Sequence, residues 1–194
     1  MRTVSKRPAA NRSIDNRRTS STPPEPPPRK RLGLISLNLL EYLYMDACPI
    51  PPLHLANLEE LQAEAGRFSH SLVPSAAHAT LVTLSGELGA GKTSFTQGIA
   101  RALGVTEPIT SPTFVLEKIY DLPEGDRYAR LVHLDAYRLE GETSLVPLGF
   151  HDLYADPKNL IVLEWPELVQ SQLPKADVSI TLSVNGEGRN ISYA

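Results

Sequence analysis

The sequence predicts an α/β fold of three layers, in which helices cover a central sheet that mixes parallel and antiparallel strands. A glycine-rich turn at residues 86–93 lies between an apolar run and an amphipathic run, which is the order strand, loop, helix. Two later apolar runs each end on a carboxylate. The chain then closes with two alternating segments around a short turn, a pattern that predicts a β-hairpin.

Composition limits the protein to one domain of ordinary size with some extra chain. The 194 residues are 41% hydrophobic and 21% charged, which is enough to bury one core. Cys48 is the one cysteine, so it has no disulfide partner within the chain and no cysteine cluster can bind a metal. This usage is typical of a reducing compartment, and we expect a cytoplasmic location.

Charge is distributed unevenly along the chain. Residues 1–31 hold nine Lys or Arg side chains against Asp15 and Glu25, a net charge of +7. The other residues hold ten basic and twenty acidic side chains, a net charge of −10. An acidic body argues against broad binding of nucleic acid by the domain itself. We therefore expect any RNA to be reached only indirectly, through a partner protein.

Residues 1–50 are predicted to be a disordered extension, because they are basic and rich in proline, as in Pro23–Pro28. The apolar run 32–44 contains Asn38 and Glu41 and is too short to span a membrane. Two interpretations stay open: an organelle transit peptide, or an upstream stretch before a true start at Met45. We expect the folded domain over residues 54–194.

The first helix is predicted just after Asn57. This residue can cap the helix, and Glu60 stands three positions later, as in a capping box. Apolar residues then recur at helical spacing, so the helix has one apolar stripe that we expect to pack on the sheet: Leu58, Leu61, Ala65, Phe68 and Leu72.

The glycine-rich turn has the form G-x-x-x-x-G-K-T, between a predicted strand at 79–85 and a predicted helix at 93–103. Such a loop turns its backbone N–H groups toward an anion, and the helix that follows directs its positive end there. Lys92 adds a charge and Thr93 offers a hydroxyl to Mg²⁺. We expect this P-loop NTPase-like domain to hold a nucleotide's phosphates with Glu87, Leu88, Gly89, Ala90, Gly91, Lys92, Thr93 and Ser94.

Residues 110–120 are predicted to form an ordered loop that enters a strand. Pro112 keeps Ser111 away from helical backbone angles, and the strand is expected over residues 114–120. The hydroxyls of Ser111 and Thr113 fit either ordinary turn chemistry or contact with a ligand.

Asp135 and Glu164 each follow a predicted strand, at 128–134 and 160–163. The carboxyl ends of parallel strands open onto the crevice beside a phosphate-binding loop, where a carboxylate reaches Mg²⁺ or the attacking water. Two candidates therefore compete for these roles. Between them we expect a short helix within residues 145–154, and after them the hairpin strands 177–184 and 188–193.

Five blocks in one order resemble the TsaE family (formerly YjeE), P-loop ATPases required for N6-threonylcarbamoyladenosine in tRNA. The resemblance covers residues 58–193. In order, the five blocks read GELGAGKTSF at 86–95, SPTF at 111–114, HLDAYRL at 133–139, LGF at 148–150 and EWPE at 164–167. The third and the fifth blocks are the most specific.

The resemblance implies a role for several of these residues. Lys92 would contact the β- and γ-phosphates, Thr93 would bind Mg²⁺, and Thr113 would act as a switch near the γ-phosphate. Asp135 and Glu164 would be the acidic pair for metal and water, which makes them, with Lys92, the catalytic candidates. Trp165 would lie beside the nucleotide, and Tyr137 and Arg138 would sense nucleotide state or meet a partner. The family commonly has Asp at Glu87 and Thr at Ser94, and both replacements keep the chemical type.

By resemblance, the cofactors are ATP and Mg²⁺, intrinsic hydrolysis is weak, and the partner is the TsaB–TsaD heterodimer. The protein would keep that complex turning over rather than transfer the threonylcarbamoyl group itself. Two alternatives remain. A small-molecule kinase would usually carry an arginine-rich lid, but residues 140–156 contain no Lys or Arg. A non-catalytic, nucleotide-gated scaffold would bind ATP or ADP without useful turnover.

Overall fold

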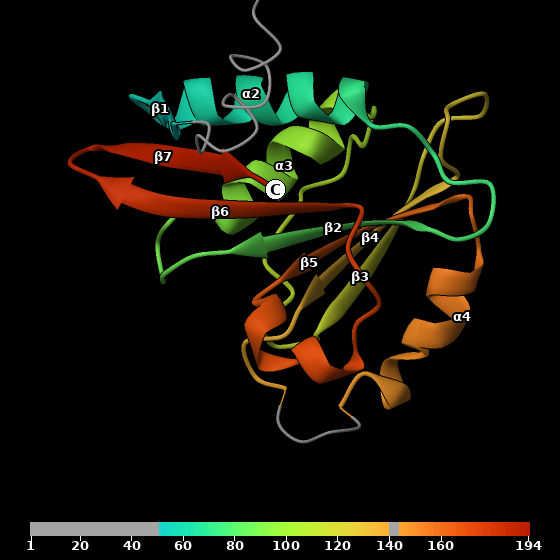
Figure 1. The fold of residues 1–194 in the computed structure, drawn as a ribbon. Coiled ribbons are helices and arrows are strands. Elements are labelled where there is room, and N and C mark those ends of the chain that lie inside the picture. The colour runs from blue at the N-terminus through green and yellow to red at the C-terminus, as the bar shows by residue number, and fades with distance from the viewer. Residues whose placement is uncertain (1–50, 140–143) are drawn as a thin grey trace, which may run out of the picture. The chain divides into compact units, whose positions relative to one another are not determined.

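A seven-stranded sheet lies at the centre of the computed structural model, which describes residues 51–139 and 144–194 (Figure 1). The strand order in the described chain is β1-β7-β6-β2-β5-β4-β3. The expectations for residues 1–50, including Met45 and Cys48, lie outside the described residues. The strands are β1 (Leu53–Leu55), β2 (Thr80–Ser85), β3 (Glu117–Asp121), β4 (Arg130–Asp135), β5 (Asn159–Glu164), β6 (Val178–Asn185) and β7 (Gly188–Tyr193).

The sheet is mixed, as the sequence predicts. Strand β2 runs parallel to both β5 and β6, and β4 runs parallel to β5. The edges are antiparallel, with β3 on β4 and the hairpin β6–β7 continued by β1. Strands β2 and β5 are buried on both faces, which explains why both read as continuous apolar runs.

Helices lie on both faces of the sheet and give three layers (Figure 1). On one face, α2 (Leu58–Ser71) and α3 (Lys92–Ala102) share a hydrophobic core with inward residues of β2, β5 and β6. On the other face, α4 (Phe150–Ala155) and the 3₁₀ turns Val146–Leu148 and Pro166–Leu168 cover a second core. This arrangement confirms the predicted α/β fold class.

The start of α2 shows the predicted cap with one difference. The Asn57 side chain accepts a hydrogen bond from the Glu60 backbone N–H at 2.9 Å. The Glu60 carboxylate reaches back to the N–H of Ala56, at 2.7 Å, instead of that of Asn57. Leu58 is 56% exposed, so the prediction that it belongs to the buried stripe is wrong. It occupies the first turn of the helix, ahead of the point where α2 meets its neighbour.

That neighbour is mainly α3, whereas the sequence predicted packing directly on the sheet. The two helices approach closely at Gly98 on α3. A Cβ atom at this position would stand 2.6 Å from the Cβ of Ala65 and 2.8 Å from the backbone oxygen of Gln62. Nearby, the rings of Phe68 and Phe95 have centroids 5.7 Å apart. Helix α2 therefore packs mainly beside α3, and it also reaches the sheet, because the ring of Phe68 stacks on that of Tyr193 of β7 with centroids 5.6 Å apart.

We expect the substitution Gly98→Ala to lower the free energy of unfolding by about 1–3 kcal/mol, because the added methyl overpacks the contact between the helices. This loss occurs although alanine is by about 1 kcal/mol the better helix former. Gly66→Ala is the matched control, since its Cβ would meet Ala102 at an ordinary 3.5 Å and should stabilise α2 slightly. Urea denaturation measures both variants, and a more stable Gly98→Ala protein would contradict the proposed crowding.

Strand β3 begins three residues later than predicted. The N–H groups of Val115 and Leu116 both donate to the carbonyl of Pro112, at 2.9 and 2.5 Å, which closes a turn. Leu116 has a positive φ of 67°. Phe114 is 83% exposed. Residues 111–116 are therefore a loop at the end of the sheet, and this loop belongs to the site described next.

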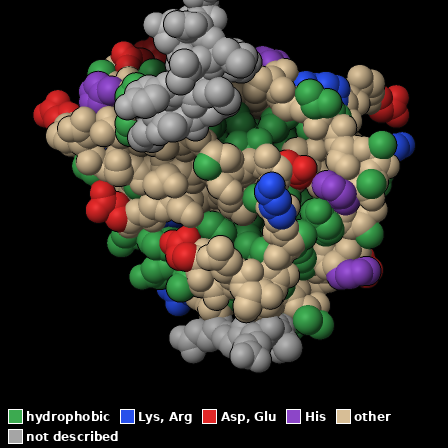
Figure 2. Space-filling model, viewed as in Figure 1, with side chains coloured by type: hydrophobic (Ala, Val, Ile, Leu, Met, Phe, Trp, Pro, Cys, Tyr) green, Lys and Arg blue, Asp and Glu red, His purple; other side chains and the backbone are tan. Residues whose placement is uncertain are grey.

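Within the described residues, no helix combines the length and the apolar character needed to cross a membrane. Figure 2 shows one face of the molecule, on which the described Lys and Arg side chains are scattered rather than gathered into a basic patch. This distribution agrees with the acidic body that the sequence indicates.

Candidate functional site

The glycine-rich loop joins the end of β2 to the start of α3, where the sequence predicted it. Gly86 has a φ of 141° and passes so close to β6 that a Cβ atom would stand 2.2 Å from the carbonyl oxygen of Leu182. Gly91 caps α3 in a left-handed conformation with a φ of 103°. Only glycine fits these two positions without strain. The loop is thus held open at the positive end of α3.

Lys92 is nearly buried, with 4% of its surface exposed. Its ammonium group donates to the carbonyl oxygens of Gly86 at 2.6 Å and Glu87 at 3.0 Å. It also lies 3.5 Å from the ring centroid of Trp165, a cation–π contact. Burial lowers the pKa of Lys92, and the carboxylates of Glu164 and its acidic neighbours oppose that shift. The side chain is therefore held at the centre of the loop.

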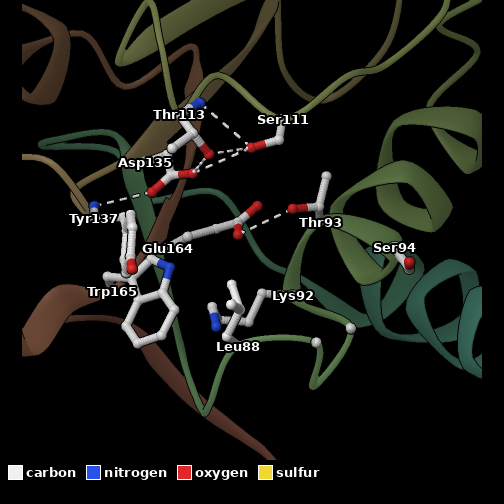
Figure 3. Close-up of a pocket in the computed structure, with 12 residues that line it drawn as sticks. Leu88, Lys92, Thr93, Ser94, Ser111, Thr113, Asp135, Tyr137, Glu164 and Trp165 are labelled. Atoms are coloured by element: carbon white, nitrogen blue, oxygen red, sulfur yellow. Dashed lines mark hydrogen bonds between the residues drawn. The ribbon is translucent and has the colours of Figure 1, made fainter.

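Two carboxylates face the loop from neighbouring strands. Asp135 and Glu164 are paired in the register of β4 and β5, and each is only 2% exposed. Glu164 Oε2 accepts a hydrogen bond from the Thr93 hydroxyl at 3.1 Å. Figure 3 shows both carboxylates directed into one pocket, with Thr93 on the side of α3 and Trp165 on the opposite side. The prediction that the two strand ends meet the loop is confirmed.

Asp135 also organises the loop at 111–116. Its Oδ2 accepts hydrogen bonds from the hydroxyls of Thr113 at 2.5 Å and Ser111 at 3.2 Å (Figure 3). Its Oδ1 accepts from the backbone N–H of Tyr137 at 2.9 Å. One carboxylate therefore ties together the end of β4, the turn after it and the hydroxyl-bearing loop. The hydroxyls of Ser111 and Thr113 were expected either to stabilise a turn or to contact a ligand. Their bonds to Asp135 at the pocket favour the second interpretation.

Two aromatic side chains, Tyr137 and Trp165, line this pocket. The rings of Tyr137 and Trp165 have centroids 5.1 Å apart. Arg138 lies over the ring of Phe114, with its guanidinium carbon 4.5 Å from the centroid. Trp165 itself has a positive φ of 61°, an uncommon conformation for this residue type. The strained backbone carries the indole over Lys92.

The pocket has a volume of about 370 Å³. Glu87 and Ala90 are absent from its lining: the Glu87 carboxylate accepts from the N–H of Val184 on β6, and Ala90 is packed in the core. The other residues predicted to bind the nucleotide or metal all line the pocket, namely Leu88, Gly89, Gly91, Lys92, Thr93, Ser94, Thr113, Asp135, Glu164 and Trp165.

Sequence reasoning missed two features of the site. His133 is fully buried, and its Nε2 lies 2.7 Å from Glu164 Oε1. The signal was present, because strand alternation puts His133 on the same face as Asp135. The second feature is a cavity of about 200 Å³ on the far side of the loop, lined by the start of α2 and by Arg189 of β7. Local patterns do not reveal that β7 comes next to the loop.

The donors present suit a magnesium ion bound together with phosphates. Among the described residues, no three His, Cys, Asp or Glu side chains are grouped as a metal site of their own. Mg²⁺ commonly takes one or two carboxylates, a hydroxyl and the oxygens of the substrate. Thr93, Glu164 and Asp135 supply that kind of set at the edge of the phosphate loop.

The loop, its lysine and the two strand-end carboxylates define a P-loop nucleotide-binding protein of the α/β class. Comparison with known families narrows this class. The family model described as threonylcarbamoyl adenosine biosynthesis protein TsaE matches residues 55–191. The chain belongs to the TsaE family.

Individual relatives agree with this assignment. The tRNA threonylcarbamoyladenosine biosynthesis protein TsaE of Bacillus subtilis is 39% identical over 114 residues, which are 58% of this chain and 68% of the relative. The protein of the same name from Treponema pallidum is 39% identical over 118 residues, 59% of this chain and 82% of the relative. The crystal structure of Bacillus subtilis YdiB superposes with a TM-score of 0.58 at 29% identity, covering 73% of this chain and 82% of YdiB.

Proposed function

We propose that this chain is the Mg²⁺-dependent, ATP-binding and ATP-hydrolysing subunit required for N6-threonylcarbamoyladenosine modification of tRNA. It would act on the TsaB–TsaD heterodimer and would not perform the transfer itself. One observation carries the proposal: Lys92 and Thr93 of the phosphate loop face Asp135 and Glu164 across one pocket. The family and the names of the relatives support the tRNA pathway.

The phosphates would lie along the loop, held by the backbone N–H groups of residues 87–94. The Lys92 ammonium now bonds two carbonyl oxygens of its own loop. Phosphate oxygens would replace these neutral acceptors with charged ones, which form stronger hydrogen bonds. For Glu87 and Ala90, whose side chains point elsewhere, the proposed contact is through the backbone.

The adenine end of the nucleotide would extend into the cavity beside α2. Gly89, Gly91 and Ser94 line both cavities, so the two cavities adjoin the same part of the loop. The exposed side chain of Leu58 offers an apolar surface to a base, and Arg189 closes the other side by donating to the carbonyl of Gly89 at 3.1 Å.

Mg²⁺ would be held by the Thr93 hydroxyl and by Glu164 or Asp135, and it would supply charge neutralisation at the β- and γ-phosphates. Asp135 would position the attacking water or complete the metal site. Because Asp135 already holds the hydroxyls of Thr113 and Ser111, the loop at 111–116 would respond to the γ-phosphate. The exposed Phe114 and its partner Arg138 would present that response to the heterodimer.

We further propose that residues 54–194 act as the ATPase domain, in the cytoplasm, with tRNA reached only through the partner. The acidic body and the scattered basic side chains of Figure 2 support this indirect contact.

The test is ATP hydrolysis by the purified chain, alone and with the TsaB–TsaD heterodimer. We expect slow hydrolysis alone and a several-fold increase with the heterodimer. When tRNA and an activated threonylcarbamoyl donor are also supplied, repeated formation of the modified adenosine should require both this chain and ATP. Transfer of the phosphate to a metabolite would instead identify a kinase. Tight binding of ATP with no turnover, with or without the heterodimer, would identify a scaffold, and either result contradicts the proposal.

A further inference from the structure

His133 lies in the sheet directly behind Glu164. It stands on β4, in register with Val162 of β5, and its side chain has no exposure to solvent. Leu131, His133 and Asp135 alternate with Val132 and Leu134, so these three share the face of the sheet that α3 covers. Glu164 projects from β5 on that same face. The imidazole therefore meets the carboxylate from the neighbouring strand, inside the protein.

The contact between them is short and directional. His133 Nε2 is 2.7 Å from Glu164 Oε1. An ionised carboxylate only accepts, so with Glu164 in that form the hydrogen would be on Nε2. Nδ1 is buried and has no hydrogen-bond partner among the described residues. A polar ring buried with one nitrogen unpaired costs stability, which an apolar side chain at this place would avoid. Among the described residues, the side chain of His133 has one hydrogen-bond partner, which is Glu164.

This contact fixes the direction of the carboxylate. With Oε1 held by His133, Oε2 is turned toward the Thr93 hydroxyl at 3.1 Å. Glu164 is also near enough to Lys92 to raise the pKa of that ammonium against the effect of burial. Without His133 the carboxylate would be free to turn toward Lys92. The Glu164 carboxylate would then move away from the Thr93 hydroxyl, where the phosphate loop meets the end of β5.

We propose that His133 is a positioning residue that holds Glu164 ready to take part in binding Mg²⁺ with the nucleotide. This inference rests on the metal role of Glu164 in the proposed function. His133 itself would touch neither metal nor nucleotide. Groups that orient a ligand from behind in this way typically change metal affinity 10- to 100-fold when they are removed.

The test compares His133→Leu, which fills the same space without a donor, with His133→Gln, whose amide nitrogen can donate to the same oxygen. Calorimetry measures ADP binding over a range of Mg²⁺ concentrations and in EDTA. For His133→Leu we expect the ADP affinity in EDTA to be unchanged, within about twofold. The Mg²⁺ concentration that gives the half-maximal increase in ADP affinity should be about tenfold higher than for the native protein. His133→Gln should return to within about threefold of the native requirement.

A second readout needs no nucleotide. In ¹⁵N-histidine NMR spectra of the native protein alone, His133 should carry its proton on Nε2 and exchange it slowly with water. Glu164→Gln should shift that signal. A proton on Nδ1, or a signal that Glu164→Gln leaves unmoved, would overturn the inference whether or not the leucine variant folds.

Glu164→Gln also separates the two proposals. If this variant changes the Mg²⁺ requirement and His133→Leu does not, only the role of His133 is refuted. If Glu164→Gln leaves the Mg²⁺ requirement unchanged, the metal role of Glu164 is itself refuted, and the inference about His133 is refuted with it.

Discussion

Replacing Lys92 by alanine is expected to weaken ATP and ADP binding by about 100-fold or more. Lys92 is the one cation among the described residues that line the pocket, where Asp135 and Glu164 add negative charge. Without Lys92, an anionic nucleotide would enter a pocket whose charged side chains are all negative. A 100-fold loss corresponds to about 2.7 kcal/mol, within the ~1.5–3 kcal/mol that a hydrogen bond to a charged group contributes.

Lys158→Ala is the matched control for that experiment. Lys158 is exposed and immediately precedes β5, at the end of the strand opposite to Glu164. Its removal takes away the same charge but leaves the pocket intact, so nucleotide affinity should stay within about twofold. Calorimetric titration with ADP measures both variants, and thermal unfolding confirms that each is folded. Native affinity in Lys92→Ala would show that the phosphates bind elsewhere.

Replacing Asp135 by alanine is expected to leave nucleotide binding nearly intact and to slow hydrolysis about 100-fold, the lower range for a group that acts on the reacting water. Its carboxylate receives the hydroxyls of Thr113 and Ser111 and the N–H of Tyr137. The substitution removes both a charge beside the γ-phosphate position and the anchor of the loop. Phosphate release under saturating ATP measures the rate, and ADP titration measures binding.

Two further variants separate charge from anchoring. Asp135→Asn loses the charge but keeps one oxygen, which can accept from the N–H of Tyr137, and its amide nitrogen can donate to the hydroxyl oxygen of Thr113. Ser111→Ala keeps the charge and removes one of the two hydroxyl contacts. We expect Asp135→Asn to be about as slow as Asp135→Ala, and Ser111→Ala to lose less than tenfold. A native rate in Asp135→Ala would refute the proposed role, and a native rate in Asp135→Asn would reduce that role to anchoring.

Much of the fold was predictable because its signals are local. The order of strand, loop and helix around Lys92, the cap at Asn57 and the terminal hairpin each depend on residues that are close in sequence. Burial on both faces made β2 and β5 readable as continuous apolar runs. The sequence also predicted that Asp135 and Glu164 both reach the crevice beside the loop, since the carboxyl ends of parallel strands open onto it. Only the structure showed that β4 and β5 are neighbours.

The wrong predictions concern contacts between distant parts of the chain. Leu58 continues an apolar pattern, yet α2 rests on α3 in a way that leaves this residue outside the contact. Apolar residues at 114–115 suggested a strand, but the carbonyl of Pro112 draws the next two N–H groups into a turn. Helix packing overruled the apolar pattern at Leu58, and backbone hydrogen bonds overruled the strand propensity of residues 114–115. The sequence pattern encodes neither of these contacts.

The sequence by itself determined that this protein has a phosphate-binding loop and two carboxylates at strand ends, because a glycine-rich turn and an apolar run that ends on a carboxylate are local properties of the chain. Only the tertiary structure decided how those groups are oriented. It placed His133 behind Glu164, joined Thr113 to Asp135, and attached the side chain of Glu87 to β6. These contacts join strands and loops far apart in sequence, and they exist only once the register of β4 on β5 and the position of β6 beside β2 are set.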